Sequence, residues 1–190
     1  MVEFEGILMK LVSDPRYLSY CEFGETRPRH PEGKIKNHIL QLETNLKKLE
    51  SLITVDEHWV LMFLIHCHDI CKMLADQEGL PSLHPRSHAT LSKKFASEYT
   101  NREDVLNMIQ YHDENFFLWE QFKHDGYCDA VQLNSLVNNI ENWDIFLAFT
   151  IVDGYIPGKE LGKIPWFINE VKPLVSTRVD TSWFHRLIAE

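Results

Sequence analysis

A histidine–aspartate pair, His68 and Asp69, closes an apolar stretch of the sequence and is followed by Lys72. Ionisable groups are costly to bury at the end of such a stretch unless something compensates them. A divalent transition metal would do so, because neutral imidazole and carboxylate are ordinary ligands of these metals. A helix end in contact with water can carry the same pair. Further histidines and an aspartate downstream, each expected on an apolar helix face, favour the metal.

Six side chains share this inward, polar character: His38, His68, Asp69, His88, His112 and Asp153. Taken singly, an inward histidine is more often a hydrogen-bonded core residue, and an aspartate before a glycine is commonly a turn residue. One metal centre explains all of them with a single cause. Such N and O donors can hold two metal ions if the central aspartate bridges them. They favour Fe, Mn, Co, Ni, Zn or Mg over a structural zinc site with thiolate ligands.

Hydrophobic spacing predicts a helix over residues 34–52, and His38 lies in its apolar stripe. Thr54 and Glu57 have the spacing of a capping box, which predicts the start of a central helix. We expect this helix to continue through the His-Asp pair.

The central helix would place the pair and the lysine on one side. His68 lies four residues after Leu64 on the apolar face, and Asp69 borders that face. Lys72 is four residues after His68, so we expect it one turn further along, beside the histidine.

Ser87 is a plausible N-cap for the next helix, which we expect to run through Tyr99. His88 then lies in its first turn, where the positive helix end disfavours a cation. We therefore expect His88 to stay neutral, which is the ligand form of imidazole.

Two more helices are expected to carry the remaining polar residues. Asn101 with Asp104 predicts the cap of a helix whose inner face ends at His112, and Asp113 follows at once. Residues 129–153 read as one long helix or two shorter ones that end near Asp153. The rest of the chain is expected to form a short helix over residues 3–13, a loop over 13–31 and two short helices over 166–174 and 182–189. The predicted fold is therefore all-α.

Composition limits the class of protein. The chain has 190 residues, 44% of them hydrophobic and 25% charged, which indicates one globular, soluble domain. Its net charge of −9 argues against a general nucleic-acid surface. No apolar run is long enough to span a membrane and no signal peptide opens the chain, so we expect no membrane association and a cytoplasmic location.

The four cysteines, Cys21, Cys67, Cys71 and Cys128, show no disulfide framework. Cys67 and Cys71 lie one turn apart beside His68, so a thiolate metal site is an alternative there. A cysteine on a buried helix is, however, more often a small core residue.

The ordered pattern of histidines and aspartates on helices resembles the HD-domain superfamily of metal-dependent phosphohydrolases. The likeness is closest to the HD domain attached to bacterial tRNA nucleotidyltransferases. The residues that carry it are His68-Asp69-Ile70-Cys71-Lys72, then residues 83–88 with Pro85-Arg86, then Tyr111-His112-Asp113, and Asp153 followed by Gly158-Lys159. It covers about residues 33–159. The resemblance implies a single HD domain over residues 1–190, with residues 1–32 and 160–190 packed on that core as extensions.

The resemblance also implies an all-α helical bundle with a buried metal site and phosphodiesterase and phosphatase activity on small nucleotide phosphoesters. This chain departs from the family at Cys71, where a glycine is usual. It also lacks the motifs of a nucleotidyltransferase domain, so transfer of CMP or AMP to tRNA is not expected.

We therefore expect an enzyme that hydrolyses a small phosphorylated substrate, such as a nucleotide, through metal-activated water. Asp69, Lys72 and Asp113 are the expected catalytic residues, and Lys72, Arg86 and Lys159 are expected to bind the substrate phosphate. Two alternatives stay open. One is a mixed-valent di-iron oxygenase of HD type, which uses the same kind of ligands. The other is an inactive HD module that binds a nucleotide or a protein.

Overall fold

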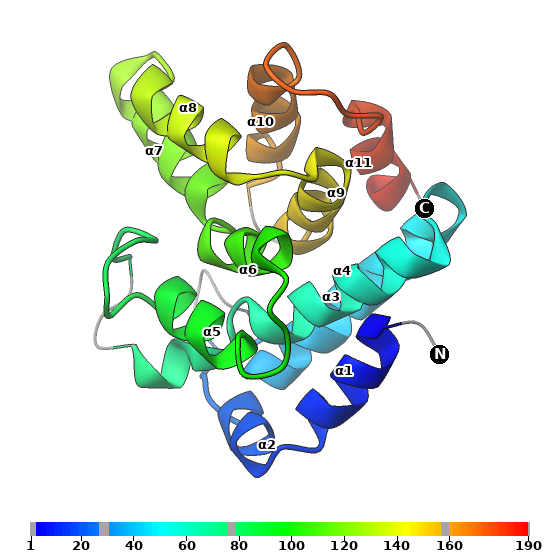
Figure 1. Cartoon of the computed structure of the whole chain (residues 1–190). Coiled ribbons are helices and arrows are strands. Elements are labelled where there is room, and N and C mark those ends of the chain that lie inside the picture. The colour runs from blue at the N-terminus through cyan, green and yellow to red at the C-terminus, as the bar shows by residue number, and fades with distance from the viewer. Residues whose placement is uncertain (1–2, 27–30, 76–78, 157–159, 190) are drawn as a thin grey trace.

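Every regular element in the part of the chain that the structure describes is a helix, as predicted, and no strand occurs there. The computed structural model describes residues 3–26, 31–75, 79–156 and 160–189. The α-helices, in chain order, are α1 (Glu3–Val12), α2 (Pro15–Cys21), α3 (Ile35–Leu49), α4 (Val55–Cys67), α5 (His88–Ala96), α6 (Glu103–Gln110), α7 (Glu114–Asp125), α8 (Ala130–Asn139), α9 (Trp143–Gly154), α10 (Lys163–Val171) and α11 (Thr181–Ile188). Two 3-10 helices, η1 (Glu50–Leu52) and η2 (Ile70–Leu74), follow α3 and α4 (Figure 1).

Helix α4 lies at the centre of the bundle. It packs against α1, α3, α5, α6 and α9, and buried residues such as Leu61, Phe63 and Ile65 point to different sides of it. A helix that is apolar all round has no solvent face, which is why this one is enclosed. The predicted capping box is present: the Thr54 hydroxyl accepts from the N–H of Glu57, and the Glu57 carboxylate accepts from the N–H of Thr54. The cap thereby fixes where the central helix begins.

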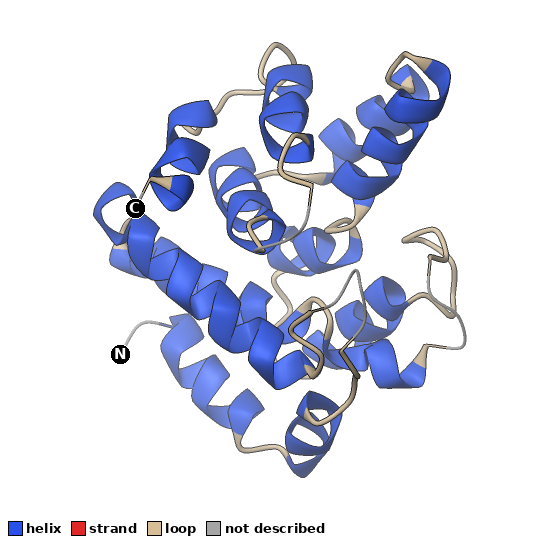
Figure 2. Ribbon diagram, turned by 180° about the vertical axis from the view of Figure 1, so that it is seen from behind, coloured by secondary structure: helices blue, strands red, loops and turns tan. Residues whose placement is uncertain are grey.

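Helix α9 is the second enclosed helix. Phe146 and Phe149 on it are among the largest fully buried side chains, and the helix packs against α3, α4, α10 and α11. One hydrophobic cluster extends from Phe4 near the start of the chain to Leu187 near its end. Seen from behind, the remaining helices surround this core (Figure 2). None of the described helices has the length and apolar character needed to cross a membrane.

Helix α2 lies where the sequence predicts only a loop. The Asp14 carboxylate accepts a hydrogen bond from the N–H of Arg16 at 2.7 Å, and Pro15 occupies the first helical position. The missing N–H of a proline is no loss there, because that N–H has no partner within a helix. The proline that suggests a loop therefore begins a helix.

Helix α4 ends at Cys67 and does not continue through Lys72 as predicted. His68 is its C-cap, Asp69 is the N-cap of η2, and Cys71 has non-helical dihedral angles, φ −93° and ψ 16°. The tighter 3-10 turn therefore determines where the Lys72 side chain lies relative to Asp69.

Two further expectations about helix ends are wrong in detail. Helix α5 ends at Ala96 and does not reach Tyr99. Arg102 is the N-cap of α6 and makes no capping hydrogen bond with its side chain, while Asp104 pairs with that arginine at 2.5 Å. Residues 129–153 form two helices, α8 and α9, because Asn142 caps α9 by accepting from the N–H of Ile145.

Candidate metal centre

The six predicted ligands come together between five elements of the bundle. His38 is on α3, His68 and Asp69 join α4 to η2, His88 is the first residue of α5, His112 lies between α6 and α7, and Asp153 is the residue before the end of α9. Residues from 38 to 153 thus meet at one place because α4 and α9 pack directly on each other and on their neighbours.

The first group of donors consists of His38, His68 and Asp153. The Nε2 atom of His38 lies 3.1 Å from Asp153 Oδ1 and 3.2 Å from His68 Nε2. His68 Nε2 lies 3.6 Å from the same Oδ1 atom. One ligand atom from each residue falls within 4.8 Å of the others, a spacing at which they can share a metal ion.

The second group consists of Asp69, His88 and His112. Asp69 Oδ1 lies 3.2 Å from His88 Nε2 and 3.4 Å from His112 Nε2, and the two nitrogens are 3.2 Å apart. Its other oxygen, Oδ2, faces the first group, at 3.6 Å from His38 Nε2 and 3.4 Å from His68 Nε2. Asp69 therefore lies between the two groups, with one carboxylate oxygen facing each.

Asp113 adds another carboxylate to the second group. Its Oδ2 atom lies 3.1 Å from His88 Nε2, and its Oδ1 atom lies 3.6 Å from His112 Nε2. The residue is the N-cap of α7 but makes no capping hydrogen bond with its side chain, so the carboxylate is directed to the histidines. Asp113 thus lies beside the candidate ligands His88 and His112, as expected.

Backbone carbonyls orient two of the histidines. The Nδ1 atom of His68 donates to the carbonyl oxygens of Leu64 and Ile65, and Nδ1 of His112 donates to that of Ile109 at 2.8 Å. A carbonyl oxygen only accepts, so in each ring Nδ1 carries a proton and Nε2 is the atom that faces the other candidate ligands. This is how metal-binding histidines are usually held.

The carboxylates control the charge of the histidines. Burial lowers the pKa of His68 and of His88, but in each case neighbouring carboxylates outweigh burial. Asp69 and Asp153 raise the pKa of His68 to about 10, while Asp113 and Asp69 raise that of His88 to about 9. The expectation that His88 stays neutral is therefore wrong for the site without metal, because it considered only the helix end.

The same pairing acts on the acids. Burial alone would raise the pKa of Asp69, yet Lys72 and His68 lower it well below its usual value. The pKa of Asp153 is likewise lowered against burial, by its hydrogen bonds with His38 and His68. Both carboxylates are thus ionised, which is the form that binds a metal.

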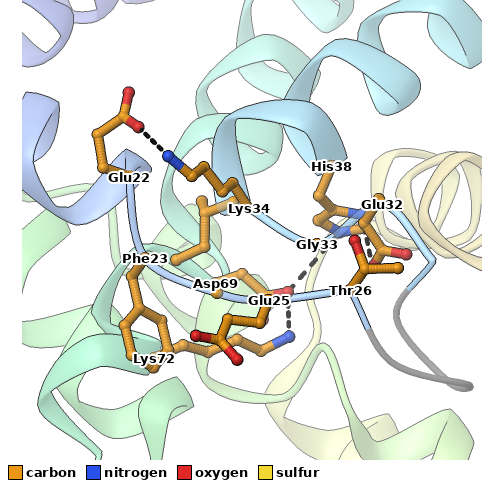
Figure 3. A pocket seen from close by; sticks show the side chains of 12 residues that line it. Glu22, Phe23, Glu25, Thr26, Glu32, Gly33, Lys34, His38, Asp69 and Lys72 are labelled. Carbon is orange, nitrogen blue, oxygen red and sulfur yellow. Dashed lines mark hydrogen bonds and ion pairs between the residues drawn. The ribbon is translucent and has the colours of Figure 1, made fainter.

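Lys72 contacts Asp69, a partner that the expected continuous helix did not predict. Its Nζ atom donates to Asp69 Oδ2 at 2.5 Å, three residues away across the 3-10 turn. Burial lowers the pKa of Lys72, but the charge of Asp69 more than offsets this, so the side chain is a cation. Lys72 also lines a cavity together with His38 and Asp69, as Figure 3 shows.

The donor set fits a metal ion by two criteria. Asp69 Oδ1 is buried and makes no hydrogen bond, although two imidazole nitrogens lie within 3.4 Å of it. A buried carboxylate oxygen without a hydrogen bond is costly, and a cation removes this cost. All donors are imidazole nitrogen or carboxylate oxygen, which suits the divalent metals expected from the sequence.

Asn45 is a positioning residue that the sequence reasoning missed. It is 1% exposed on α3, and its Nδ2 atom donates to the carbonyl oxygens of Val152 and Tyr155 at 2.8 and 2.7 Å. These carbonyls flank Asp153, so Asn45 holds the end of α9 that carries this ligand. The only signal in the sequence is an asparagine inside an apolar stripe, between Leu42 and Leu46.

Of the other two predicted phosphate-binding residues, Arg86 is described by the structure. Arg86 is exposed in the loop before α5 and is not among the cavity residues described. Lys159 lies outside the described residues. Among the described residues, Lys72 is the predicted cation that contacts a candidate ligand.

The cysteines do not join the ligand groups formed by the described residues. The pKa of Cys67 is raised well above its usual value, mainly by burial and to a smaller extent by the neighbouring Cys71. Burial raises the pKa of Cys71 to about 11. Both are free thiols in the core, so the thiolate alternative receives no support.

No protein-family model, no curated protein and no solved structure matches this chain. The resemblance to the HD-domain superfamily therefore rests on the residues of the sequence and stays a prediction.

Proposed function

We propose that this chain is a metal-dependent phosphohydrolase that acts on a small phosphoester such as a nucleotide. The observation that carries the proposal is the position of Asp69 between two groups of histidines, with the cation of Lys72 on the same carboxylate. A divalent metal ion held by these residues supplies Lewis-acid activation of water and of the phosphoryl oxygen. His38, His68 and Asp153 would hold one ion, and His88 and His112 with Asp69 would hold another.

Lys72 supplies the positive charge that the reaction needs beside the metals. Its ammonium group reaches the ligand carboxylate without being a ligand itself, since it is protonated. A lysine in this position binds a phosphate oxygen as a point charge and stabilises the negative charge that develops on it. A cation here also favours an anionic substrate, which the oxygenase alternative does not require.

Asp113 holds His88 in place at the second position. Its contact with His88 Nε2 at 3.1 Å puts a carboxylate where it can orient an imidazole or accept a hydrogen bond from water. The order of ligands along the chain, which resembles the HD-domain superfamily, supports the same reaction class.

The test is reconstitution of purified protein with Mn, Fe, Co, Ni, Zn or Mg, each followed by a hydrolysis screen. The screen uses a generic phosphodiester, a generic phosphomonoester and a set of nucleotides. We expect turnover with at least one metal, and its loss with His68→Ala. His124→Ala is the matched control, because this histidine is exposed on the last turn of α7.

Absence of phosphoester hydrolysis with every metal would reject the proposal. Oxygen consumption by the iron-loaded protein, with a mixed-valent signal in electron paramagnetic resonance, would replace it by the oxygenase. Nucleotide binding without turnover in every metal would replace it by the inactive module.

A further inference from the structure

Gln110 is a buried polar residue beside the candidate metal centre that is not among its donors. It is the last residue of α6 and stands two positions before His112 in the chain. Its side chain is 6% exposed, although glutamine is usually a surface residue. Buried polar groups are hydrogen-bonded as a rule, so the partners of this amide show what it holds.

The amide of Gln110 joins α6 to the segment that carries His88. Its Nε2 atom donates to Thr90 Oγ1 at 3.0 Å and to the carbonyl oxygen of Ser82. Thr90 is in the first turn of α5, two residues after His88, and Ser82 lies in the loop that leads into this helix. One side chain therefore binds both the start of α5 and the loop before it.

Two hydroxyl groups at the start of α5 bind the same carbonyl oxygen. Ser87 Oγ and Thr90 Oγ1 each donate to the carbonyl oxygen of Ser82 at 2.8 Å. Ser87 also caps α5 by accepting from the N–H of Thr90 at 3.1 Å. Because each group in this network is bound to the others, the network determines how α5 leaves the loop.

The separation of His88 and His112 depends on how α5 and α6 are held together. The two helices lie side by side, and one carries His88 while the other leads into His112 (Figure 1). The Nε2 atoms of these histidines are 3.2 Å apart in the second donor group. The bond between Gln110 and Thr90 lies two residues from each histidine along the chain. A change in this bond should therefore reach both imidazoles.

We infer that Gln110 is a positioning residue of the second metal position, which acts through Thr90 and Ser82 to hold His88 beside His112. This inference rests on the metal centre of the proposed function, but it concerns assembly of that centre and not the reaction. Gln110 is not a candidate ligand, so its effect passes through the two histidines.

Gln110→Met tests the inference, because methionine has a similar length but no N–H group. Titration of metal-free protein with Mn²⁺, followed by electron paramagnetic resonance of the free ion, measures both metal affinities below the melting temperature. We expect one position to bind as in wild type and the other about tenfold more weakly, as loss of an outer partner commonly costs.

Substitutions of Thr90 give an independent test if Gln110→Met does not fold. Thr90→Val removes the hydroxyl group at similar volume and should weaken the same position as Gln110→Met. Thr90→Ser keeps the hydroxyl group and should retain the wild-type affinity at that position. Equal affinities in the two threonine variants would contradict the inference.

Variants of the ligands identify which position is weakened. In a His88→Ala background the second position has already lost a ligand, so Gln110→Met should change metal affinity by no more than about twofold. In an Asp153→Asn background, which impairs the first position, Gln110→Met should lower the remaining affinity about tenfold. The reverse pattern would assign Gln110 to the first position and overturn the inference.

Lys93→Met is the matched control. It removes a bond from Lys93 Nζ to Asn107 Oδ1 at 2.8 Å, which joins the same two helices one turn further from the histidines. Its metal affinities should equal those of wild type. The inference is overturned if this control weakens the second position as much, if Gln110→Met weakens both positions equally or neither, or if wild type binds only one ion.

The readout is metal binding, which keeps this inference separate from the proposed reaction. Selective loss at the second position in a protein that hydrolyses no phosphoester would uphold the role of Gln110 and reject the phosphohydrolase. Phosphoester hydrolysis by a protein whose metal affinities do not change in Gln110→Met would uphold the phosphohydrolase and reject this role.

Discussion

At the scale of single residues, Asp69 differs from the other acids of the site because each of its oxygens faces a different pair of histidines. Asp153 faces only the first pair. We expect Asp69→Asn to lower metal occupancy at both positions and Asp153→Asn to lower it chiefly at one. The metal-to-protein ratio after loading and gel filtration measures this difference. Equal losses in the two variants would show that Asp69 is not a bridge.

Lys72 separates catalysis from assembly of the site. Lys72→Ala leaves every candidate ligand in place, so the metal content should be retained. Loss of a cation placed beside a developing oxyanion should lower kcat about a hundredfold or more. Lys94→Ala, at an exposed position on α5, is the control. Wild-type turnover in Lys72→Ala would show that the lysine has no role in catalysis and only pairs with Asp69.

The raised pKa values of His68 and His88 predict how pH affects the protein without metal. Their pKa values are about 10 and about 9 when folded, against 6.5 for an unperturbed histidine. A histidine whose pKa is higher in the folded than in the unfolded protein stabilises the fold fully at pH values below its unfolded pKa. This stabilisation is lost as the pH rises to its folded pKa. The melting temperature with chelator should thus fall between about pH 6.5 and 9.

Thermal melts in the presence of chelator check this, and His88→Gln should flatten the decline. A metal ion competes with the same protons, so metal affinity should rise over the same pH range. A melting temperature that climbs toward pH 9 without metal would contradict the assignment of charged histidines.

Residue-level patterns predicted which side chains meet at the candidate site because each histidine was expected on a helix face that its apolar neighbours define. The contact between Lys72 and Asp69 was not predicted, for a local reason. The sequence gives no sign that α4 stops at Cys67, and the 3-10 turn that follows places the lysine against Asp69. The charge of His88 was also beyond the sequence, because it depends on carboxylates from other helices.

At the scale of elements, the ligands depend on how helix ends are held. Asn45 joins the middle of α3 to the end of α9 through two carbonyls. Asn45→Ala should leave these buried acceptors without a donor and cost about 1–3 kcal/mol of unfolding free energy. It should also weaken metal binding at the position that contains Asp153. Urea unfolding and metal titration measure the two effects.

Asn134→Ala on α8 is the control for this substitution, because that asparagine is exposed. Metal affinity equal to wild type in Asn45→Ala would mean that α9 holds Asp153 without help from α3. The sequence could not reveal this bond, because its partners lie 107 and 110 residues away and are backbone groups, which every residue has. Helix α2 was missed for a different reason: Pro15 ends helices in general but is favoured at their first position.

At the scale of the whole molecule, five elements far apart in the chain supply the donors, so the site exists only in the folded bundle. The free energy of metal binding therefore adds to the stability of the folded protein, less any binding of the metal to the unfolded chain. At a free metal concentration of about 100 Kd, one site adds about 2.7 kcal/mol of stability. For a chain of this size this corresponds to a rise in melting temperature of about 5 to 10 °C.

Metal removal should reverse this rise, and Asp69→Asn should abolish most of it because both positions lose a ligand. Scanning fluorimetry with and without Mn²⁺, before and after chelation, measures the shift. His124→Ala should behave as wild type, since its side chain is 87% exposed and away from the donors. A shift that survives in Asp69→Asn would place the stabilising metal elsewhere on this acidic chain, whose net charge is −9, and would remove the main support for the proposed reaction.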